Sequence, residues 1–392
     1  MIRVLHGDCL DVLAGMEENS VHAVMTDPPY HLTSIVKRFG KEGSAPAAAG
    51  VYGRSSAGFM GKTWDGGRIA FEPETWAAVM RVLKPGGHML AFGGTRTWHR
   101  LACAIEDAGF EYRDTFLWLY GSGFPKSHNP GEQMDRDMWD ETELDRGERS
   151  HRSAFWGGFG TAVKPAWEPL ILARKPLDGT VAANVLKWGC GGLNIDGCRI
   201  ESGGEHMRGE VKSRNEGTWS GSGGMHTPGR GFVATDSPLG RWPANIAHDG
   251  SDEVMASFAA FGTSTSSDQP RHNGEFKSVA KGREPPHTTS GHSDTGSSAR
   301  FFYTAKADKA DRADSKHPTV KPVDLIRHYV RLITPPGGTV LDVFAGSGTT
   351  GEAAMLEGFD CILIEKDPKS VKDINHRIKR WSGLDMPLFA AD

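Results

Sequence analysis

The stretch Val340-Leu341-Asp342-Val343-Phe344-Ala345-Gly346-Ser347-Gly348-Thr349-Thr350-Gly351 begins as an apolar strand, turns through glycines and continues as a helix. Gly346, Gly348 and Gly351 satisfy the pattern G-x-G-x-x-G, whose glycines permit a tight turn and close approach of a ligand. Dinucleotides, S-adenosylmethionine and plain tight turns all use such glycines. Glu365 ends the next expected strand 14 residues after Gly351, whereas nicotinamide enzymes typically place this carboxylate about 20 residues on. No Gly-Lys-Ser/Thr follows, which excludes a P-loop.

Short apolar runs alternate with amphipathic ones on both sides of this stretch. The expected helices are 75–83, 98–108, 323–333, 349–357 and 369–380, and the expected strands are 21–25, 88–92, 112–120, 339–344 and 361–365. Because strands and helices alternate, the sequence predicts an α/β fold around a mostly parallel sheet.

The middle of the chain has a different composition. Of the 50 glycines in the 392 residues, 20 lie between Gly189 and Gly296, so this part is expected to be rich in loops. We therefore expect residues 1–120 and 311–392 to form two halves of one domain, with 121–310 as a large insertion. A long insertion is either a functional binding region or a disordered segment without a role, and the composition leaves both open.

Charge and hydropathy limit the class of protein. The formal net charge of −4 excludes a chain that is basic throughout, although a local basic channel stays compatible with it. No apolar run reaches the roughly 18 residues that cross a bilayer, and the first residues do not resemble a signal peptide. The five cysteines are scattered and not at zinc spacing, so we expect a cytoplasmic protein without disulfides or a metal site.

A second motif, Thr26-Asp27-Pro28-Pro29-Tyr30, follows the expected strand 21–25 directly. Two prolines stiffen the backbone and remove two donors, which leaves their carbonyl oxygens free to accept. Asp27 and the Pro28 carbonyl can each accept one N–H of an exocyclic amine on a planar ring, while Tyr30 stacks on the ring face. The alternative is a strand that simply ends at two prolines with a surface Asp and Tyr.

The two motifs together resemble those of the amino-methylating DNA methyltransferases, in which F-x-G-x-G binds S-adenosylmethionine and D-P-P-Y holds the base. Further matches to the family are His6-Gly7-Asp8-Cys9-Leu10, Val82-Leu83-Lys84-Pro85-Gly86-Gly87 and His317-Pro318-Thr319-Val320-Lys321-Pro322. Here the acceptor motif comes first and the cofactor motif last, which resembles the circularly permuted β-class. Gly121–Lys126 and Arg241-Trp242-Pro243-Ala244-Asn245 resemble prophage-type members. The resemblance implies a Rossmann-like methyltransferase fold in which 121–310 is the target-recognition region.

The resemblance also implies which residues meet S-adenosylmethionine. Glu365 is expected to hold the ribose hydroxyls, Asp8 and Cys9 to meet the adenine, and Thr319 with Lys321 to lie near the methionine end. The full expected set is Asp8, Cys9, Thr319, Lys321, Asp342, Phe344, Ala345, Gly346, Ser347, Gly348, Thr349, Thr350 and Glu365. Asp27, Pro28, Pro29 and Tyr30 are the expected catalytic residues.

Double-stranded DNA is the implied partner, with the target base flipped out of the helix. The basic residues that follow the acceptor motif, Lys37, Arg38, Lys41, Arg54 and Lys62, are opposed by Glu42 alone and are expected to contact phosphates. A solvated loop is the alternative. β-class members often pair, so the resemblance implies a homodimer, and the enzyme is either solitary or accompanied by a separately encoded restriction nuclease.

Adenine N6 is the expected target atom because Asp typically begins this tetrapeptide in adenine-N6 members, while cytosine-N4 members more often begin it with Ser. Cytosine N4 is the chemical alternative. No cysteine follows a proline, which argues against cytosine-C5 chemistry through a thiolate. From other classes, a nicotinamide oxidoreductase leaves Asp27-Pro28-Pro29-Tyr30 without a task, and an inactive DNA-binding scaffold does not require the motif to be intact.

Overall fold

The computed structural model describes residues 1–30, 68–123, 125, 127–137, 153–201, 240–265, 294–305, 311 and 320–382. The chain forms two compact units. The first comprises Met1–Leu193, Asn245–Val254 and Thr304–Asp392, and the second comprises Asn194–Ala244 and Met255–Tyr303.

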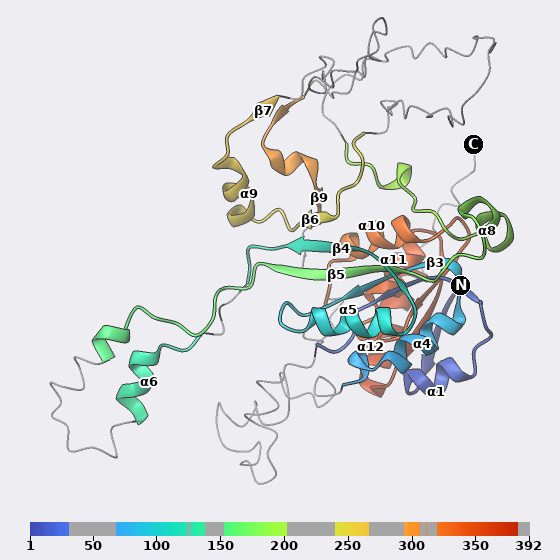
Figure 1. The fold of residues 1–392 in the computed structure, drawn as a ribbon, viewed down its shortest axis with the longest axis horizontal. Helices are drawn as coiled ribbons and strands as arrows, with labels where there is room; N and C mark the ends of the chain where they lie inside the picture. The colour runs from blue at the N-terminus through green and yellow to red at the C-terminus, as the bar shows by residue number, and fades with distance from the viewer. Residues whose placement is uncertain are drawn as a thin grey trace, which may run out of the picture. The chain divides into compact units, whose positions relative to one another are not determined.

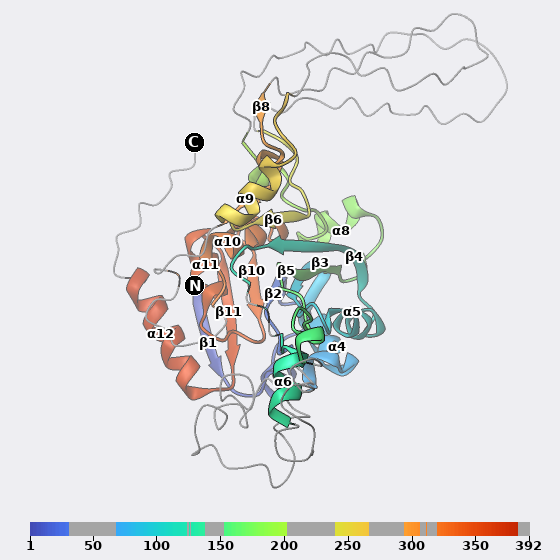
Figure 2. The same ribbon diagram turned by 90° about the vertical axis from the view of Figure 1, so that its left-hand side faces the viewer.

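A nine-stranded sheet organises the first unit (Figure 1). Its strands, in spatial order, are β1 (Ile2–His6), β11 (Asp360–Glu365), β10 (Thr339–Asp342), β2 (Val21–Thr26), β3 (Leu83–Phe92), β5 (Trp167–Arg174), β4 (Glu111–Leu119), β6 (Ile246–His248) and the two-residue β9 (Tyr303–Thr304). The strands from β1 to β3 are parallel, and β5 runs antiparallel to both of its neighbours. Two strands from the C-terminal part of the chain therefore lie between two from the N-terminal part (Figure 2).

Helices cover both faces of this sheet. The helices of the first unit are α1 (Cys9–Ala14), α4 (Pro73–Val82), α5 (Trp98–Asp107), α6 (Pro130–Asp137), α8 (Val181–Trp188), α10 (Val323–Ile333), α11 (Thr349–Leu356) and α12 (Pro368–Ser382), with a 3-10 turn at Ile69–Phe71. α1, α4 and α5 pack over Met89 and Ala91 in one apolar core. Because successive strand residues face opposite sides, Phe92 points to the other face. There Tyr329 of α10 meets Phe116 of β4 edge to face.

The local elements follow the predicted alternation, with boundaries shifted by a few residues. The main difference is β5, which lies inside the expected insertion yet occupies the middle of the sheet. Its run Leu170-Ile171-Leu172-Ala173 is buried, and such a continuous apolar run is typical of a central strand. Residues 121–193 belong to the first compact unit together with the first 120 residues, while the expected boundary after residue 120 stays a prediction. The sheet is mixed in its second half because β5 is antiparallel.

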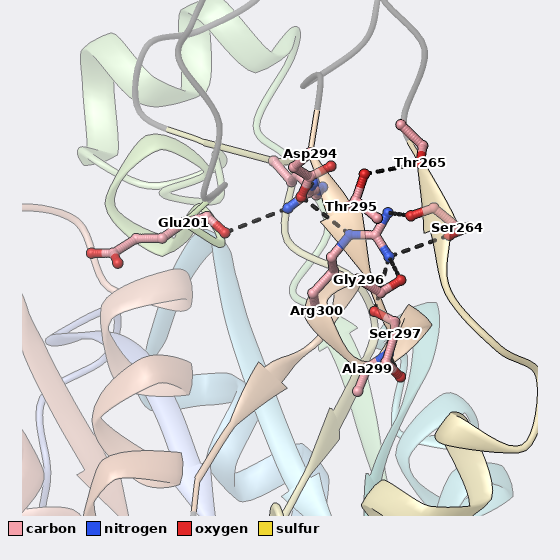
Figure 3. Close-up of polar contacts among 10 residues, drawn as sticks. Glu201, Ser264, Thr265, Asp294, Thr295, Gly296, Ser297, Ala299 and Arg300 are labelled. Carbon is pink, nitrogen blue, oxygen red and sulfur yellow. Dashed lines mark hydrogen bonds and ion pairs between the residues drawn. The ribbon is translucent and has the colours of Figure 1, made fainter.

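The second unit holds a small polar network (Figure 3). β7 (Ser264–Thr265) pairs with β8 (Thr295–Gly296), and Arg300 donates to the carbonyl oxygens of Ser264 at 2.8 Å and Gly296 at 2.5 Å. Arg300 and Arg241 both pair with buried Asp294. These two arginines therefore serve the structure of the unit. Its other elements are 3-10 turns at Asp196–Cys198 and Ser298–Phe301, and α9 (Asp252–Ala259) crosses from the first unit.

Within the described ranges, no helix combines the length and apolar character needed to span a membrane.

Candidate active site

The acceptor turn, residues 27–30, leaves the carboxyl end of β2 in the first unit. Asp27 is held from two sides: the Tyr30 hydroxyl donates to Oδ1 at 2.8 Å, and Lys321 Nζ donates to Oδ2 at 2.9 Å. The Asp27 side chain keeps 24 % of its surface exposed. A carboxylate in this position is oriented by the protein and still presents lone pairs to a ligand.

Lys321 is the cation that pairs with the acceptor turn. Its ammonium lies 3.2 Å from the Tyr30 hydroxyl, 3.0 Å from Glu168 Oε2 and 4.6 Å from the centre of the Phe92 ring. Only 8 % of the side chain is exposed. Burial by itself lowers the pKa of Lys321, but the carboxylates of Asp27 and Glu168 outweigh it and raise the pKa above the ordinary value. Lys321 is therefore a permanent cation, and its ammonium contacts Asp27 and Tyr30 of the acceptor turn.

Tyr30 is fixed at both ends. Its backbone carbonyl accepts a hydrogen bond from Thr97 Oγ1 at 2.9 Å, and a Cβ at Gly94 would come within 3.1 Å of its ring. Burial, followed by the charges of Asp27 and Glu168, raises the pKa of the phenol well above its usual range. Tyr30 is thus a neutral donor that orients Asp27, while its stacking on a base stays a prediction.

The Pro28 carbonyl accepts no hydrogen bond from any residue in the described part of the chain. Pro28 itself is buried and Pro29 partly exposed. A carboxylate held by two donors and a carbonyl whose lone pairs accept no hydrogen bond from the described residues therefore belong to adjacent residues, which suits the two hydrogens of an amine.

The glycine turn, residues 344–348, follows β10, the strand next to β2. Gly346 and Gly348 have φ of +53° and +80°, which L side chains rarely adopt. A Cβ at Gly348 would lie 3.0 Å from Ile374, and one at Gly351 would lie 2.5 Å from Leu363. The glycines thus allow the turn itself and the close packing of α11 on β11, as the pattern predicts.

Asp342 ends β10 and ties the two turns together. Its carboxylate accepts from Thr26 Oγ1 at 2.7 Å, Thr350 Oγ1 at 2.6 Å and the Phe344 amide at 3.1 Å. Burial raises its pKa to about 6. Because Thr26 directly precedes Asp27, this aspartate fixes the acceptor motif relative to the glycine turn.

Glu365 ends β11 beside the glycine turn. Its Oε2 accepts from the Gly346 amide at 2.8 Å and its Oε1 from the Asp367 amide at 2.7 Å, and burial raises its pKa. Each oxygen keeps a second lone pair for a hydroxyl of a ligand. Asp8, on the adjacent β1 side, caps α1 through the Leu10 amide and pairs with Lys366 at 2.9 Å. Both carboxylates fit a ribosyl-adenine group.

The remaining expected cofactor residues occupy different environments. Cys9 belongs to the apolar core, and burial raises the pKa of its thiol to about 11, so it is a packing residue rather than a reactive one. Phe344 is partly buried and Ala345 donates its amide to Ile364 at 3.0 Å. Ser347, Thr349 and Thr350 are buried. Thr319 and the basic set Lys37, Arg38, Lys41, Arg54 and Lys62 lie outside the described residues.

Sequence reasoning missed the groups that support these turns. Arg377 of α12 is 1 % exposed, donates to the Ser347 carbonyl at 2.9 Å and pairs with buried Glu352. Glu168 holds Lys321 from β5. Neither belongs to a motif with a recognised chemical pattern, and the basic run in α12 resembles an ordinary surface helix, so the sequence offered no signal for them.

Comparison with known proteins assigns the family. A family model described as DNA methylase, of the N6/N4 type, matches residues 21–376. The type II methyltransferase M.HindIII of Haemophilus influenzae is 22 % identical over 207 residues, covering 49 % of this chain and 64 % of that protein. M.BglI of Bacillus subtilis is 39 % identical over 81 residues, 21 % of this chain and 22 % of that protein. The alignments thus span less than two thirds of either relative.

Among solved structures, the M1.HpyAVI–SAM complex shares 15 % identity at a TM-score of 0.42, with 96 % of this chain and 99 % of that chain covered. The cytosine-N4-specific PvuII DNA methyltransferase shares 15 % identity at a TM-score of 0.45, with 96 % and 86 % covered. Members of the matched family use S-adenosylmethionine, the cofactor that the family resemblance of the two motifs implies. The chain belongs to the N6/N4 DNA methylase family.

Proposed function

We propose that this chain is a site-specific DNA methyltransferase that methylates the N6 amine of an adenine flipped out of the duplex. The observation that carries the proposal is the pair of acceptors in the acceptor turn, Asp27 and the Pro28 carbonyl, joined to the glycine turn through the Thr26–Asp342 hydrogen bond of 2.7 Å. The hydrogen-bond acceptors for the amine and the turn that suits a nucleoside lie at the same edge of one sheet. This arrangement suits transfer of a methyl group between two bound molecules.

The acceptor turn orients and polarises the amine. The nitrogen of an exocyclic amine is a poor nucleophile because its lone pair is delocalised into the ring. Asp27 and the Pro28 carbonyl, each accepting one N–H, favour a more pyramidal nitrogen with a freer lone pair. Tyr30 and Lys321 keep the Asp27 carboxylate in one orientation, so little reorganisation is needed at the moment of transfer.

The glycine turn, Glu365 and Asp8 would hold S-adenosylmethionine, which supplies an electrophilic methyl group when bound. The glycines would allow the backbone to approach it, Glu365 would accept from the ribose hydroxyls, and Asp8 would meet the adenine. Arg377 keeps the turn in place through the Ser347 carbonyl. Proximity and orientation then supply much of the rate enhancement.

Adenine is the proposed base because the acceptor motif begins with Asp, and cytosine N4 is the alternative by the same mechanism. The strand order, with β10 and β11 between β1 and β2, supports a circularly permuted arrangement. We also propose 121–310 as the target-recognition region, although β5 within it is part of the catalytic sheet. A prophage-type origin, a cytoplasmic location, a homodimer and a separately encoded nuclease partner remain predictions.

Nucleoside mass spectrometry tests this proposal. The full chain is incubated with unmethylated DNA and S-adenosylmethionine, beside the Asp27→Ala variant, and the DNA is then digested and analysed. N6-methyladenine made by the wild type alone supports the proposal. N4-methylcytosine would show that cytosine, and not adenine, is the target base. Absence of both products, although the cofactor is bound, would overturn the proposal.

A further inference from the structure

Glu168 is a carboxylate at the candidate site that no motif assigns. It is the second residue of β5, whose antiparallel direction brings its first residues to the edge where β2 and β3 end. Phe92 pairs with Leu170, two residues from Glu168, so Phe92 and Glu168 share a sheet face. Lys321 lies against both, at 4.6 Å from the Phe92 ring and 3.0 Å from Glu168 Oε2.

The Lys321 ammonium is thus shared between two carboxylates. Its distances to Asp27 Oδ2 and Glu168 Oε2 are 2.9 and 3.0 Å, and the carboxylate side chains are 24 % and 22 % exposed. Two negative groups and one positive group leave the cluster with a net charge of −1. Without Glu168, the cluster would be a neutral ion pair between Asp27 and Lys321.

We propose that Glu168 is a positioning residue for methyl transfer: by sharing Lys321 with Asp27, it leaves the acceptor turn with a net negative charge toward the amine. This inference rests on the proposed function.

The charge matters because of how transfer proceeds. The nitrogen lone pair forms the new N–C bond while the C–S bond breaks with its electron pair left on sulfur, so positive charge moves from sulfur to nitrogen. One amine proton then leaves to water, directly or through Asp27. A net negative cluster in a partly buried site stabilises the positive charge on nitrogen, whereas a neutral ion pair stabilises it less.

Glu168→Gln tests the charge with little change in shape. We expect kcat to fall on the order of 10-fold or more, with the KM for DNA and the Kd for S-adenosylmethionine changed by less than about two-fold. Glu168→Asp keeps the charge and restores most of kcat. The matched control is Glu111→Gln, since Glu111 pairs with Arg174 at the other end of β5. A wild-type kcat in Glu168→Gln, or a loss confined to KM, would refute the proposal.

A double-mutant cycle separates positioning from a general structural role. In the Lys321→Met background there is no ammonium to share, and the cluster stays negative after Glu168→Gln, so this change should lower kcat by a smaller factor than it does in the wild type. An equal loss in both backgrounds would mean that Glu168 does not act through Lys321.

A measurement independent of activity keeps the inference testable if Lys321→Met fails to fold or if the wild type methylates no DNA. The side-chain ammonium of Lys321 is observed by ¹⁵N NMR, assigned with Lys321→Arg. Glu168→Gln should shift this resonance and speed its exchange with water, while Glu111→Gln should not. An inactive wild type overturns the proposed function, and an unchanged resonance in Glu168→Gln overturns the role of Glu168.

Discussion

Asp342 ends β10 and Asp27 directly follows β2, the neighbouring parallel strand, yet the two side chains differ in burial and in the charge of their partners. β2 and β10 are paired through Val24 and Leu341, and each aspartate comes within three residues of that pair. Asp342 is 3 % exposed and is bound by two hydroxyls and an amide. Asp27 keeps 24 % of its side chain exposed and is bound by a phenol and an ammonium.

The difference distinguishes Asp342, which joins the two turns structurally, from Asp27, which we propose as an acceptor of the amine. All the partners of Asp342 are neutral groups, which satisfy its lone pairs but leave the cost of burying its charge, and its pKa is raised to about 6. Asp27 is oriented by a cation that Glu168 shares, and it retains exposed surface for a ligand. The position of an aspartate at a strand end therefore does not define its role, whereas its burial and its hydrogen-bond partners distinguish the two residues.

The largest effect is expected for Asp27→Ala. Because this change removes an acceptor of the amine without opening a core, we expect methyl transfer to fall by roughly 10³-fold or more. The melting temperature and the Kd for S-adenosylmethionine, measured by calorimetry, should stay near wild type. If the variant lost cofactor binding as strongly as activity, Asp27 would belong with Asp342 as a structural residue.

Asp342→Ala is expected to reverse that pattern. It leaves two buried hydroxyls and the Phe344 amide without their acceptor, so the free energy of unfolding should fall by about 3 kcal/mol. Cofactor affinity should fall as well, because the glycine turn loses its anchor. Urea unfolding and calorimetric titration measure both quantities. A stable variant that binds the cofactor normally would contradict the role assigned to Asp342.

The pH dependence of stability sharpens the comparison. The folded pKa of Asp342 is about 6 and its ordinary value 3.8, so the folded state binds more protons between these values. Its contribution to stability is full below pH 3.8 and is lost as the pH rises through 6. Relative to Asp342→Asn, the wild type should gain about 2 kcal/mol of stability from pH 6.5 to 4.5.

Other groups titrate in the same window, so the difference between the two proteins is the relevant quantity. Burial lowers the pKa of both His88 and His328 to about 4, and each destabilises the fold as the pH falls from 6.5 to 4. These effects are common to wild type and Asp342→Asn and cancel. Parallel stability curves for the two proteins would contradict the raised pKa of Asp342.

The smallest effect is expected for Thr26→Val. The change keeps the β-branched shape but removes the donor that joins β2 to Asp342, so stability should fall by about 1 kcal/mol. We expect kcat to fall only a few-fold, since the strand pairing still holds Asp27 near its position. Thr75→Val is a suitable control, because Thr75 Oγ1 is buried without a hydrogen-bond partner among the described residues. A larger loss in Thr75→Val than in Thr26→Val would argue against the link.

The sequence by itself determined the local elements and both turns. Gly346 and Gly348 predict a turn that only glycine tolerates, and the two prolines after Asp27 predict where β2 must end, because each feature depends on the backbone of a few neighbouring residues. The helices around α4, α5 and α10 followed from their periodic apolar residues in the same way.

Only the tertiary structure decided which residues face Asp27. Lys321 was expected near the cofactor from its motif, and only the structure shows that its ammonium donates to Asp27, 294 residues away in sequence. Glu168 reaches Lys321 because β5 inserts antiparallel between β3 and β4, and Arg377 of α12 supports the glycine turn through the Ser347 carbonyl. Strand pairing and charge pairing over such separations depend on the packing of the whole sheet, which no local pattern of residues encodes.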